Sequence, residues 1–297
     1  MRMMESNQSP NPFLSLLLVI FQYFSLKCVM LPQSSVVLTA APISAAQTLA
    51  SLLNRICVII PVRNEEESIA DVIVSLRSLG LHTIRVVDNG SSDRSAQQAR
   101  AAGADVLWEP TPGYGNACWT GLQNLPESIE WILFCDGDGS DDPNDIPALL
   151  DLILQDQPTP DFIVGDRRAT PSGQAAMTPI QNFGNALAST LIHWGWGMKY
   201  HDLGPLRLIR RSALEAIQMQ DRGFGWTVEM QIRAVELGLN IHELPVNYRP
   251  RQGGSSKISG TIIGSFKAGI IILKTVGQLY LQRVSRGRSQ KQFTQFQ

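Results

Sequence analysis

Residues 56–80 read ICVIIPVRNEEESIADVIVSLRSLG, and this stretch decides the fold. Residues 56–60 form a continuous apolar run, which is typical of a strand buried on both faces. Asn64, with Glu67 three residues later, predicts the start of a helix. Apolar residues at helical spacing follow, and Gly80 is expected to end this helix. The stretch therefore predicts a strand followed by a helix, which is the repeating unit of a parallel sheet.

The same unit recurs along the chain. Further strands are expected at residues 84–87, 104–108, 131–135, 162–164, 206–209 and 241–248. Helices are expected at residues 92–102, 116–124, 146–154, 183–194 and 227–237, with a short one opening at Ser212. Strands that alternate with helices predict an α/β fold in which helices flank a mostly parallel central sheet.

Composition excludes several classes of protein. The chain has 297 residues, 44% of them apolar and 17% charged, with a net charge of −1. A dedicated nucleic-acid binder usually carries a basic footprint, so no nucleic-acid partner is expected. The four cysteines are widely spaced, and Cys57 and Cys135 fall inside expected strands. Buried thiols of this kind indicate a reducing compartment and not a disulfide framework.

Charge is divided unevenly between the two parts of the chain. Residues 246–297 contain nine Lys or Arg and no Asp or Glu, whereas residues 1–245 contain 16 basic and 26 acidic residues. An acidic body with a basic, partly apolar tail favours contact with an anionic membrane surface. The alternative is a tail whose charges are simply solvated.

The two ends differ in character from the regular middle. Residues 13–31 are mostly apolar and nearly reach the ~20 residues that span a bilayer, although Lys27 weakens this interpretation. A cleaved signal peptide fits poorly, and a natural start at Met30 is a third option. Residues 32–54 resemble a linker. Residues 258–282 favour an amphipathic helix at a membrane interface, because Lys267 and Lys274 lie nearly on one helix face.

Three regions are therefore expected. They are an apolar segment and linker at residues 1–54, a catalytic domain at 55–252, and a basic, membrane-interacting tail at 253–297.

Polar clusters follow four of the expected strands. They are residues 61–65, 88–93, 136–143 and 165–168. A single cluster of this kind is accounted for by turn chemistry. Four clusters at the carboxyl ends of parallel strands lie on one rim of the sheet, where open α/β sheets bind ligands.

The cluster after residues 131–135 carries the most chemical information. Asp136 and Asp138 alternate around a glycine, so both carboxylates can reach one point above the sheet. Hard divalent cations that also hold phosphate oxygens use one or two carboxylates and fill the remaining positions with water and substrate. A calcium loop of the EF-hand type is excluded because a strand precedes the cluster. A solvated acidic loop is the alternative.

Three motifs now resemble a known family. Residues 59–66 (IIPVRNEE), 87–93 (VDNGSSD) and 136–139 (DGDG) are similar, in order and position, to the signature of family 2 glycosyltransferases with the GT-A fold. The resemblance covers about residues 55–250 and is greatest to the branch of dolichyl- and polyprenyl-phosphate mannose or glucose synthases. It implies a GT-A-type nucleotide-binding fold with terminal apolar segments.

The resemblance also implies an activity. The expected reaction is inverting transfer of a hexose from UDP-glucose or GDP-mannose to polyprenyl or dolichyl phosphate, assisted by Mg²⁺ or Mn²⁺. The expected location is the membrane surface, with the catalytic domain facing the cytoplasm.

Residues on the donor side are carried over from the resemblance. The residues implied to line the nucleotide are Pro61, Val62, Asn64, Glu65, Asp88 and Asp136. Asp136 and Asp138 are implied to hold the metal and the diphosphate. Asn89 stands where the family often has Asp, and Ser140 stands where this branch commonly has Gln, so Ser140 is included as a weaker metal ligand. Residues 113–116 (GYGN) are expected to present backbone N–H groups to the donor.

The acceptor side is implied to depend on cations. Arg167, Arg207, Ser256 and Lys257 match positions that the branch uses near the lipid phosphate, and guanidinium groups suit phosphate recognition. Each arginine taken singly is equally well explained as a structural ion-pair partner. Glu229 is implied to remove a proton if the acceptor is a hydroxyl, and to organise the site if it is a phosphate. The implied catalytic residues are therefore Asp138, Arg167, Arg207 and Glu229.

Three alternatives remain open. The same donor could serve a hydroxyl acceptor, such as a glycolipid or a small polar molecule. A sugar nucleotidyltransferase would need a glycine-rich loop with Arg or Lys after the first strand, which residues 61–65 do not provide. A non-catalytic binding protein would have no need for both Asp136 and Asp138.

Overall fold

A computed structural model describes residues 45–155, 158–252 and 262–294. The apolar segment at residues 13–31, and Ser256 and Lys257 of the expected acceptor site, lie outside the described residues. The chain divides into two compact units, residues 1–51 and residues 52–297.

Seven strands form one sheet, in agreement with the predicted fold class. They are β1 (Ile56–Val62), β2 (Thr83–Asp88), β3 (Asp105–Trp108), β4 (Trp131–Phe134), β5 (Phe162–Asp166), β6 (Arg207–Arg210) and β7 (Ile241–Pro245). Their order in the sheet is β3-β2-β1-β4-β6-β5-β7. Only β6 runs against its neighbours, since it pairs antiparallel with both β4 and β5. The sheet is therefore mostly parallel, as expected.

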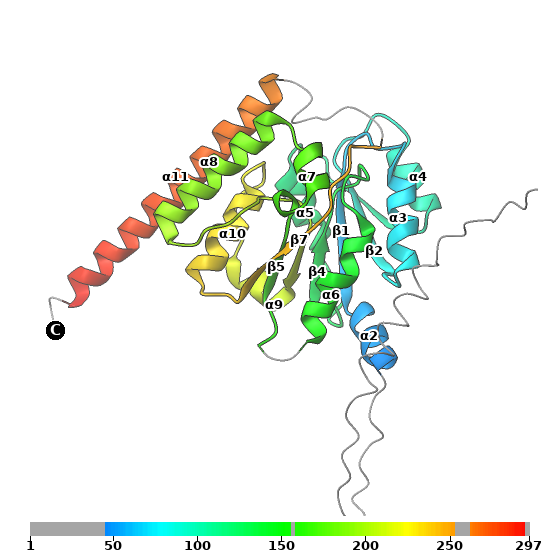
Figure 1. Cartoon of the computed structure of the whole chain (residues 1–297), viewed down its shortest axis with the longest axis horizontal. Helices are drawn as coiled ribbons and strands as arrows, with labels where there is room; N and C mark the ends of the chain where they lie inside the picture. The colour runs from blue at the N-terminus through cyan, green and yellow to red at the C-terminus, as the bar shows by residue number, and fades with distance from the viewer. Residues whose placement is uncertain (1–44, 156–157, 253–261, 295–297) are drawn as a thin grey trace, which may run out of the picture. The chain divides into compact units, whose positions relative to one another are not determined.

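Helices precede, connect or follow the strands along the chain. The α-helices of the described residues are α2 (Ala45–Leu53), α3 (Ile69–Ser78), α4 (Ser95–Ala101), α5 (Tyr114–Gly121), α6 (Ile146–Leu154), α7 (Pro171–Ala176), α8 (Pro179–Trp196), α9 (Arg211–Ile217), α10 (Trp226–Glu236) and α11 (Ile262–Thr294). Two short 3₁₀ helices, η1 (Pro143–Asp145) and η2 (Arg167–Ala169), follow β4 and β5. Figure 1 shows these elements with the same labels.

Three local predictions are corrected by the structure. The predicted helix start at Asn64 is wrong, because α3 begins at Ile69 and Asn64 adopts a left-handed backbone (φ 56°). Asparagine tolerates this conformation and is common both in turns and at the start of helices. Its presence in the sequence therefore did not distinguish a turn from a helix start. The short helix predicted to open at Ser212 begins one residue earlier, at Arg211, and has no side-chain cap. Residues 45–53, expected as linker, form α2.

The strand order creates a switch point at the centre of the sheet. From β1 the chain adds β2 and then β3 on one side, and it returns to place β4 on the other side of β1. Ligands of open α/β sheets bind in the crevice above such a point, outside the carboxyl ends of the strands. Of the four clusters expected on the rim, residues 61–65 lie at the end of β1 and residues 136–143 follow β4, so both are next to this point.

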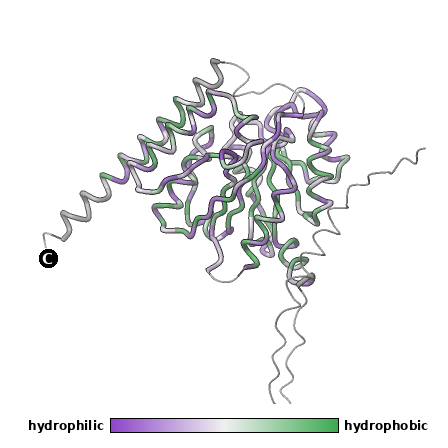
Figure 2. Tube along the Cα trace, in the orientation of Figure 1, coloured by the Kyte–Doolittle hydropathy of each residue, from purple (hydrophilic) through white to green (hydrophobic). Residues whose placement is uncertain are grey.

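Two apolar clusters hold the layers together. One packs the sheet against α5, α9 and α10, and it buries Cys57 and Cys118 with Phe134 and Trp226. The other joins α8, α10 and α11 through Ile192, Ile232 and Leu279. Figure 1 shows α11 lying along α8, and Figure 2 shows that both helices mix hydrophobic and hydrophilic residues along their length. No helix within the described ranges is long and apolar enough to span a bilayer.

Candidate active site

The ends of β1 and β2 are joined by the residues expected to line the nucleotide. The Asn64 side-chain oxygen accepts a hydrogen bond from the Ser92 N–H at 2.7 Å, and the Asn64 N–H donates to the Ser91 hydroxyl at 3.0 Å. The carboxylate of Asp88, at the end of β2, accepts from the Ser91 N–H at 2.9 Å. Glu65 is fixed by its N–H, which donates to the Ser95 hydroxyl at 2.7 Å. The left-handed turn at Asn64 thus builds one wall of the crevice.

Asn89 supports the next loop of this wall. Its amide nitrogen donates to the carbonyls of Glu109 and Thr111, and its side-chain oxygen accepts from the Gly113 N–H at 2.8 Å. Its backbone N–H donates to the Val62 carbonyl at 2.9 Å. A second Asp at this position could accept hydrogen bonds but could not donate to the two carbonyls. Asn89 is therefore a positioning residue for residues 109–113.

Residues 113–116 were expected to present backbone N–H groups to the donor, but the N–H groups of Gly113, Gly115 and Asn116 donate within the protein. The Gly115 N–H donates to the Gly223 carbonyl at 3.1 Å, and the Asn116 N–H donates to the Arg222 carbonyl at 2.8 Å. A Cβ on Gly115 would lie 2.7 Å from the Arg222 carbonyl carbon. Glycine is required here because the loop at residues 221–223 packs directly against the start of α5.

Three carboxylates crowd the loop after β4. Asp138 is buried, and one of its carboxylate oxygens accepts from both the N–H and the hydroxyl of Ser140. Ser140 therefore fixes the orientation of the Asp138 side chain. One oxygen of Asp141 accepts from the Asp136 N–H at 2.9 Å, while its other oxygen is buried and receives no hydrogen bond from the described residues. Burial, reinforced by the charges of Asp138 and Asp141, raises the pKa of Asp136 well above its usual range.

These residues fit a divalent cation. Crowded carboxylate oxygens, one of which receives no hydrogen bond from the described residues, are the donor chemistry that Mg²⁺ and Mn²⁺ prefer. No three His, Cys, Asp or Glu side chains converge as ligands of one ion in the part of the chain that the structure describes. Two carboxylates suffice when substrate oxygens and water complete the coordination.

A segment that the sequence did not single out crosses this acidic loop. Residues 246–252 follow β7, and the N–H groups of Arg249 and Gln252 donate to the carbonyls of Ser140 and Asp138. The Arg249 guanidinium lies 2.6 Å from the Asp142 carboxylate. Arg251 donates to both oxygens of Glu65 at 2.7 Å and contacts Asp138 at 2.9 Å. Two of the nine basic residues of residues 246–297 therefore pair with carboxylates of the acidic loop and of Glu65.

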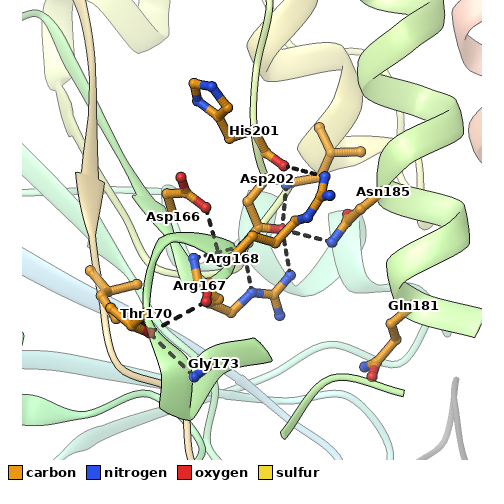
Figure 3. A network of polar contacts seen from close by, with 12 residues as sticks. Asp166, Arg167, Arg168, Thr170, Gly173, Gln181, Asn185, His201 and Asp202 are labelled. Atoms are coloured by element: carbon orange, nitrogen blue, oxygen red, sulfur yellow. Dashed lines mark hydrogen bonds and ion pairs between the residues drawn. The ribbon is translucent and has the colours of Figure 1, made fainter. Parts of the chain in front are cut away.

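Arg167 lies at the same rim, where β5 ends. Its guanidinium donates from Nε and Nη2 to the two carboxylate oxygens of Asp202 at 2.7 and 2.9 Å, and it stacks 4.8 Å from the Tyr248 ring centre. Asn185 of α8 donates to the same carboxylate at 2.7 Å. Figure 3 shows this network, with Arg167 and Asn185 approaching Asp202 from different elements. Burial alone would lower the pKa of Arg167, but the Asp202 carboxylate outweighs it and raises that pKa.

Arg207, at the start of β6, is fully enclosed. Only 1% of the residue is exposed, and its guanidinium donates to the carbonyls of Gly204 and Thr227 and to the side-chain oxygen of Gln231. Burial lowers the pKa of Arg207 to about 10. In this arrangement Arg207 joins β6 to α10.

Glu229 is also fully engaged by the protein. One carboxylate oxygen accepts from the N–H groups of Gln220 and Asp221 at 2.9 and 2.6 Å, and the other accepts from Arg233 at 2.8 Å. The residue is only 2% exposed. One oxygen therefore holds the loop between α9 and α10, which contacts the start of α5, while the other pairs with Arg233 within α10.

A polar cavity of about 990 Å³ lies beside the Arg167 network. Its lining includes Asp166 and Arg168 from the end of β5, Ser189 and His193 from α8, and Lys199. Arg168 and Lys199 give it more positive than negative charge.

The predicted residues are thus divided by their surroundings. Those of the donor side, together with Asp136 and Asp138, follow β1, β2 and β4, whereas Arg167, Arg207 and Glu229 are buried in ion pairs and hydrogen bonds with the protein. Sequence reasoning missed Asn89 as a positioning residue, and it missed Arg251 altogether. The only signal for Arg251 was a basic residue close after the last strand, on the rim where ligands bind.

Comparison with known proteins identifies relatives of the chain. Residues 57–218 match the profile of glycosyl transferase family 2. An uncharacterized glycosyltransferase of Mycobacterium tuberculosis is 35% identical over 213 residues, covering 72% of this chain and 94% of the relative. An undecaprenyl-phosphate mannosyltransferase of Micrococcus luteus is 30% identical, with 71% of this chain and 90% of the relative covered.

A solved structure shares the fold. Glucosyl-3-phosphoglycerate synthase from Mycobacterium tuberculosis in complex with UDP superposes with a TM-score of 0.63 at 20% sequence identity, covering 80% of this chain and 84% of that one. At this identity the likeness concerns the fold alone, and it agrees with a GT-A architecture.

Proposed function

The chain belongs to glycosyl transferase family 2, and from this premise we propose that it transfers a hexose from a nucleotide-sugar to a polyprenyl phosphate, with inversion, at a membrane surface. The observation that supports the proposal is the approach of the loops after β1 and β4 at the switch point of the sheet. Glu65, next to the Asn64 turn, and Asp138, next to Asp136, both contact the guanidinium of Arg251 there. A nucleoside diphosphate needs both walls, one for the nucleoside and one for the charged phosphates.

The donor would lie along these walls. Pro61, Val62, Asn64, Glu65 and Asp88 would line the base and ribose, and Asp136 and Asp138 would hold Mg²⁺ or Mn²⁺, with Ser140 orienting Asp138 by its hydrogen bonds. Such an ion neutralises negative charge that develops on a departing diphosphate. Solved structures of the M. tuberculosis synthase contain Mg²⁺ or Mn²⁺ together with UDP, which supports the choice of metal.

A phosphate acceptor agrees with the surroundings of Glu229 and Asp202, whose carboxylates are both engaged by protein donors. An oxygen of the acceptor phosphate would attack the anomeric carbon as the bond from that carbon to the diphosphate breaks, and the nucleoside diphosphate leaves. A phosphate monoester is already an anion at neutral pH and needs no base. A hydroxyl acceptor would need one, yet Glu229 is enclosed by three donors and Asp202 is paired with Arg167. This favours the phosphate over the hydroxyl.

The acceptor side would contain two kinds of cation: arginines held in place by protein partners, and basic residues that line the adjoining cavity. Arg167 and Arg207 would shape this side, since their guanidinium groups are held by protein partners. Ser256 and Lys257 would add contacts to the phosphate. Arg168 and Lys199 line the adjoining cavity and add positive charge next to it.

The membrane would be met by α8 and α11. Exposed apolar side chains on these helices are Ile180, Phe183, Trp194, Ile270, Leu273, Tyr280 and Leu281, with Phe183 and Trp194 at 70% and 77% exposure. Residues 253–297 carry seven basic residues and no acidic ones. Apolar side chains beside cations suit an anionic bilayer. We therefore assign residues 55–252 to the transferase domain, facing the cytoplasm, and residues 253–297 to the membrane-interacting tail.

The experiment is a transfer assay with separated products. The full chain is incubated with radiolabelled UDP-glucose or GDP-mannose, polyprenyl phosphate and Mn²⁺, and the lipid is extracted into organic solvent. Label in the organic phase that depends on the lipid phosphate supports the proposal. Label transferred only to an added lipid alcohol or sugar supports a hydroxyl acceptor, and release of pyrophosphate from a sugar phosphate and a nucleoside triphosphate supports a nucleotidyltransferase. Either result would refute the proposed acceptor chemistry.

A further inference from the structure

Arg251 links the two walls of the crevice. Its Nη1 donates to both oxygens of Glu65 at 2.7 Å, and its Nη2 lies 2.9 Å from a carboxylate oxygen of Asp138. Glu65 follows β1 and Asp138 follows β4, so one guanidinium spans the switch point. The Glu65 and Asp138 side chains are 8% and 7% exposed, whereas Arg251 keeps a quarter of its side chain in solvent.

The charge balance explains this contact. Glu65 and Asp138 are buried carboxylates, and Asp136 and Asp141 add further negative charge beside Asp138. Buried like charges repel one another, and a buried carboxylate without a partner is strongly destabilising. A planar guanidinium donates in several directions at once, which a single ammonium cannot do with the same geometry. Arg251 therefore neutralises two carboxylates from different parts of the chain.

We propose that Arg251 is an internal cation that occupies the Asp138 carboxylate when no divalent metal is bound, and that Arg251 and the metal compete for it. This inference rests on the proposed function, which puts the metal at Asp136 and Asp138. A divalent ion binds a carboxylate oxygen at about 2.0–2.1 Å and repels a neighbouring guanidinium, so both cations do not share the Asp138 oxygen. Arg251 thereby lowers the affinity of the empty enzyme for metal.

The backbone around Arg251 allows its side chain to move alone. The segment is attached to the acidic loop through backbone hydrogen bonds of Arg249 and Gln252 to Ser140 and Asp138. Arg249 adds an ion pair with Asp142, which lies outside the pair of expected metal ligands. Displacement of Arg251 from Asp138 thus leaves these attachments in place, and its contact with Glu65 limits the distance it moves.

The test compares Arg251→Gln with a matched variant of the same segment, Arg249→Gln. Mn²⁺ is titrated into the full chain without nucleotide, and free Mn²⁺ is followed by electron paramagnetic resonance. Removal of the competing cation is expected to lower the Kd for Mn²⁺ about tenfold in Arg251→Gln, which corresponds to about 1.4 kcal/mol. Arg249→Gln is expected to stay within about twofold of the unchanged protein, because Asp142 is not a proposed ligand.

Thermal unfolding supplies a readout that is independent of metal titration. In EDTA, Arg251→Gln is expected to unfold at a lower temperature than the unchanged protein, and saturating Mn²⁺ is expected to close most of that gap. Arg251→Lys keeps the positive charge but loses the planar set of donors. Its Mn²⁺ affinity is therefore expected to lie between that of the unchanged protein and that of Arg251→Gln. This variant also guards against poor folding of Arg251→Gln.

Two results would overturn the inference in distinguishable ways. An unchanged or weaker Mn²⁺ affinity in both Arg251 variants, with binding abolished by Asp138→Asn, would show a metal site for which Arg251 does not compete. Mn²⁺ binding that survives Asp138→Asn would instead place the metal elsewhere, and it would overturn the metal site of the proposed function together with this inference.

Discussion

Arg167 and Asp202 form a bidentate ion pair inside the protein, with Nε and Nη2 of the arginine 2.7 and 2.9 Å from the two carboxylate oxygens. Asp202 has no exposed surface, and it also accepts from the N–H groups of Arg167 and Leu203. The pair attaches the loop before β6 to the end of β5. The guanidinium of an arginine that the sequence predicts near the acceptor phosphate is thus bound to a buried carboxylate of the protein.

Asp202→Asn is expected to destabilise the protein strongly. The substitution removes one member of a buried pair and leaves the Arg167 charge uncompensated, which costs about 3–5 kcal/mol in comparable cases. Chemical denaturation measures the free energy of unfolding. The matched control is Glu215→Gln, which breaks the surface i,i+4 pair with Arg211 and is expected to cost no more than about 0.5 kcal/mol. Equal losses in the two variants would contradict the structural role of Asp202.

The same pair predicts a dependence of stability on pH. Burial alone would raise the pKa of Asp202, but Arg167 outweighs burial and holds that pKa below its usual range. A carboxylate with a lowered folded pKa contributes its full stability above the unfolded value of about 3.9 and loses it as pH falls through the folded value. Unfolding free energy is therefore expected to fall below about pH 4, and Asp202→Asn is expected to remove part of that fall. Parallel pH curves for the two proteins would refute the assignment.

Asp138→Ala is expected to abolish metal-dependent transfer in a protein that still folds. The variant removes a proposed metal ligand, and loss of one group that stabilises developing charge lowers kcat about 100-fold or more. It also frees Arg251 from one of its two carboxylates, which leaves the ion pair with Glu65 in place. Transfer is measured by the extraction assay and folding by circular dichroism. Unchanged turnover would contradict the proposed mechanism.

The sequence predicted the parts of the site that are local. An apolar run followed by Asp, Asn and Gly defines both a buried strand and the polar loop at its end, so the positions of residues 61–65, 88–93 and 136–143 at strand ends could be predicted. Parallel strands then bring these loops together, because their carboxyl ends share one edge of the sheet. The crevice between β1 and β4 follows from this arrangement.

Partners that are distant in sequence could not be predicted in this way. Arg251 lies 186 residues from Glu65, and no local pattern distinguishes it from the other basic residues of the tail. The surroundings of Arg207 and Glu229 likewise depend on how α10 packs against β6, which composition and spacing do not determine. The sequence alone does not distinguish an arginine that contacts an acceptor phosphate from an arginine that is buried in an ion pair.

Glu229→Gln is expected to reduce stability without changing the shape of the pH–rate profile. Its carboxylate accepts three hydrogen bonds, and an amide in its place would turn an NH₂ group toward one of those donors. A loss of about 3 kcal/mol of unfolding free energy is expected from breaking this buried pair with Arg233. Rates measured from pH 5 to 9 provide the check. A general base would instead cost about 10²–10⁴-fold and remove the acidic limb, which would contradict the positioning role.

Gly115→Ala is expected to perturb the donor side through packing. A Cβ at this position would lie 2.7 and 2.8 Å from backbone atoms of Arg222 and Asp221, so the loop between α9 and α10 must shift. Overpacking of this kind costs about 1–3 kcal/mol, and the shift is expected to raise KM for the nucleotide-sugar because residues 109–116 form part of the proposed donor wall. The matched control is Gly184→Ala in α8, where a Cβ meets nothing within 4 Å and a gain of up to about 1 kcal/mol is expected. An unchanged KM in Gly115→Ala, together with the expected loss of stability, would show that residues 109–116 do not contribute to binding of the nucleotide-sugar.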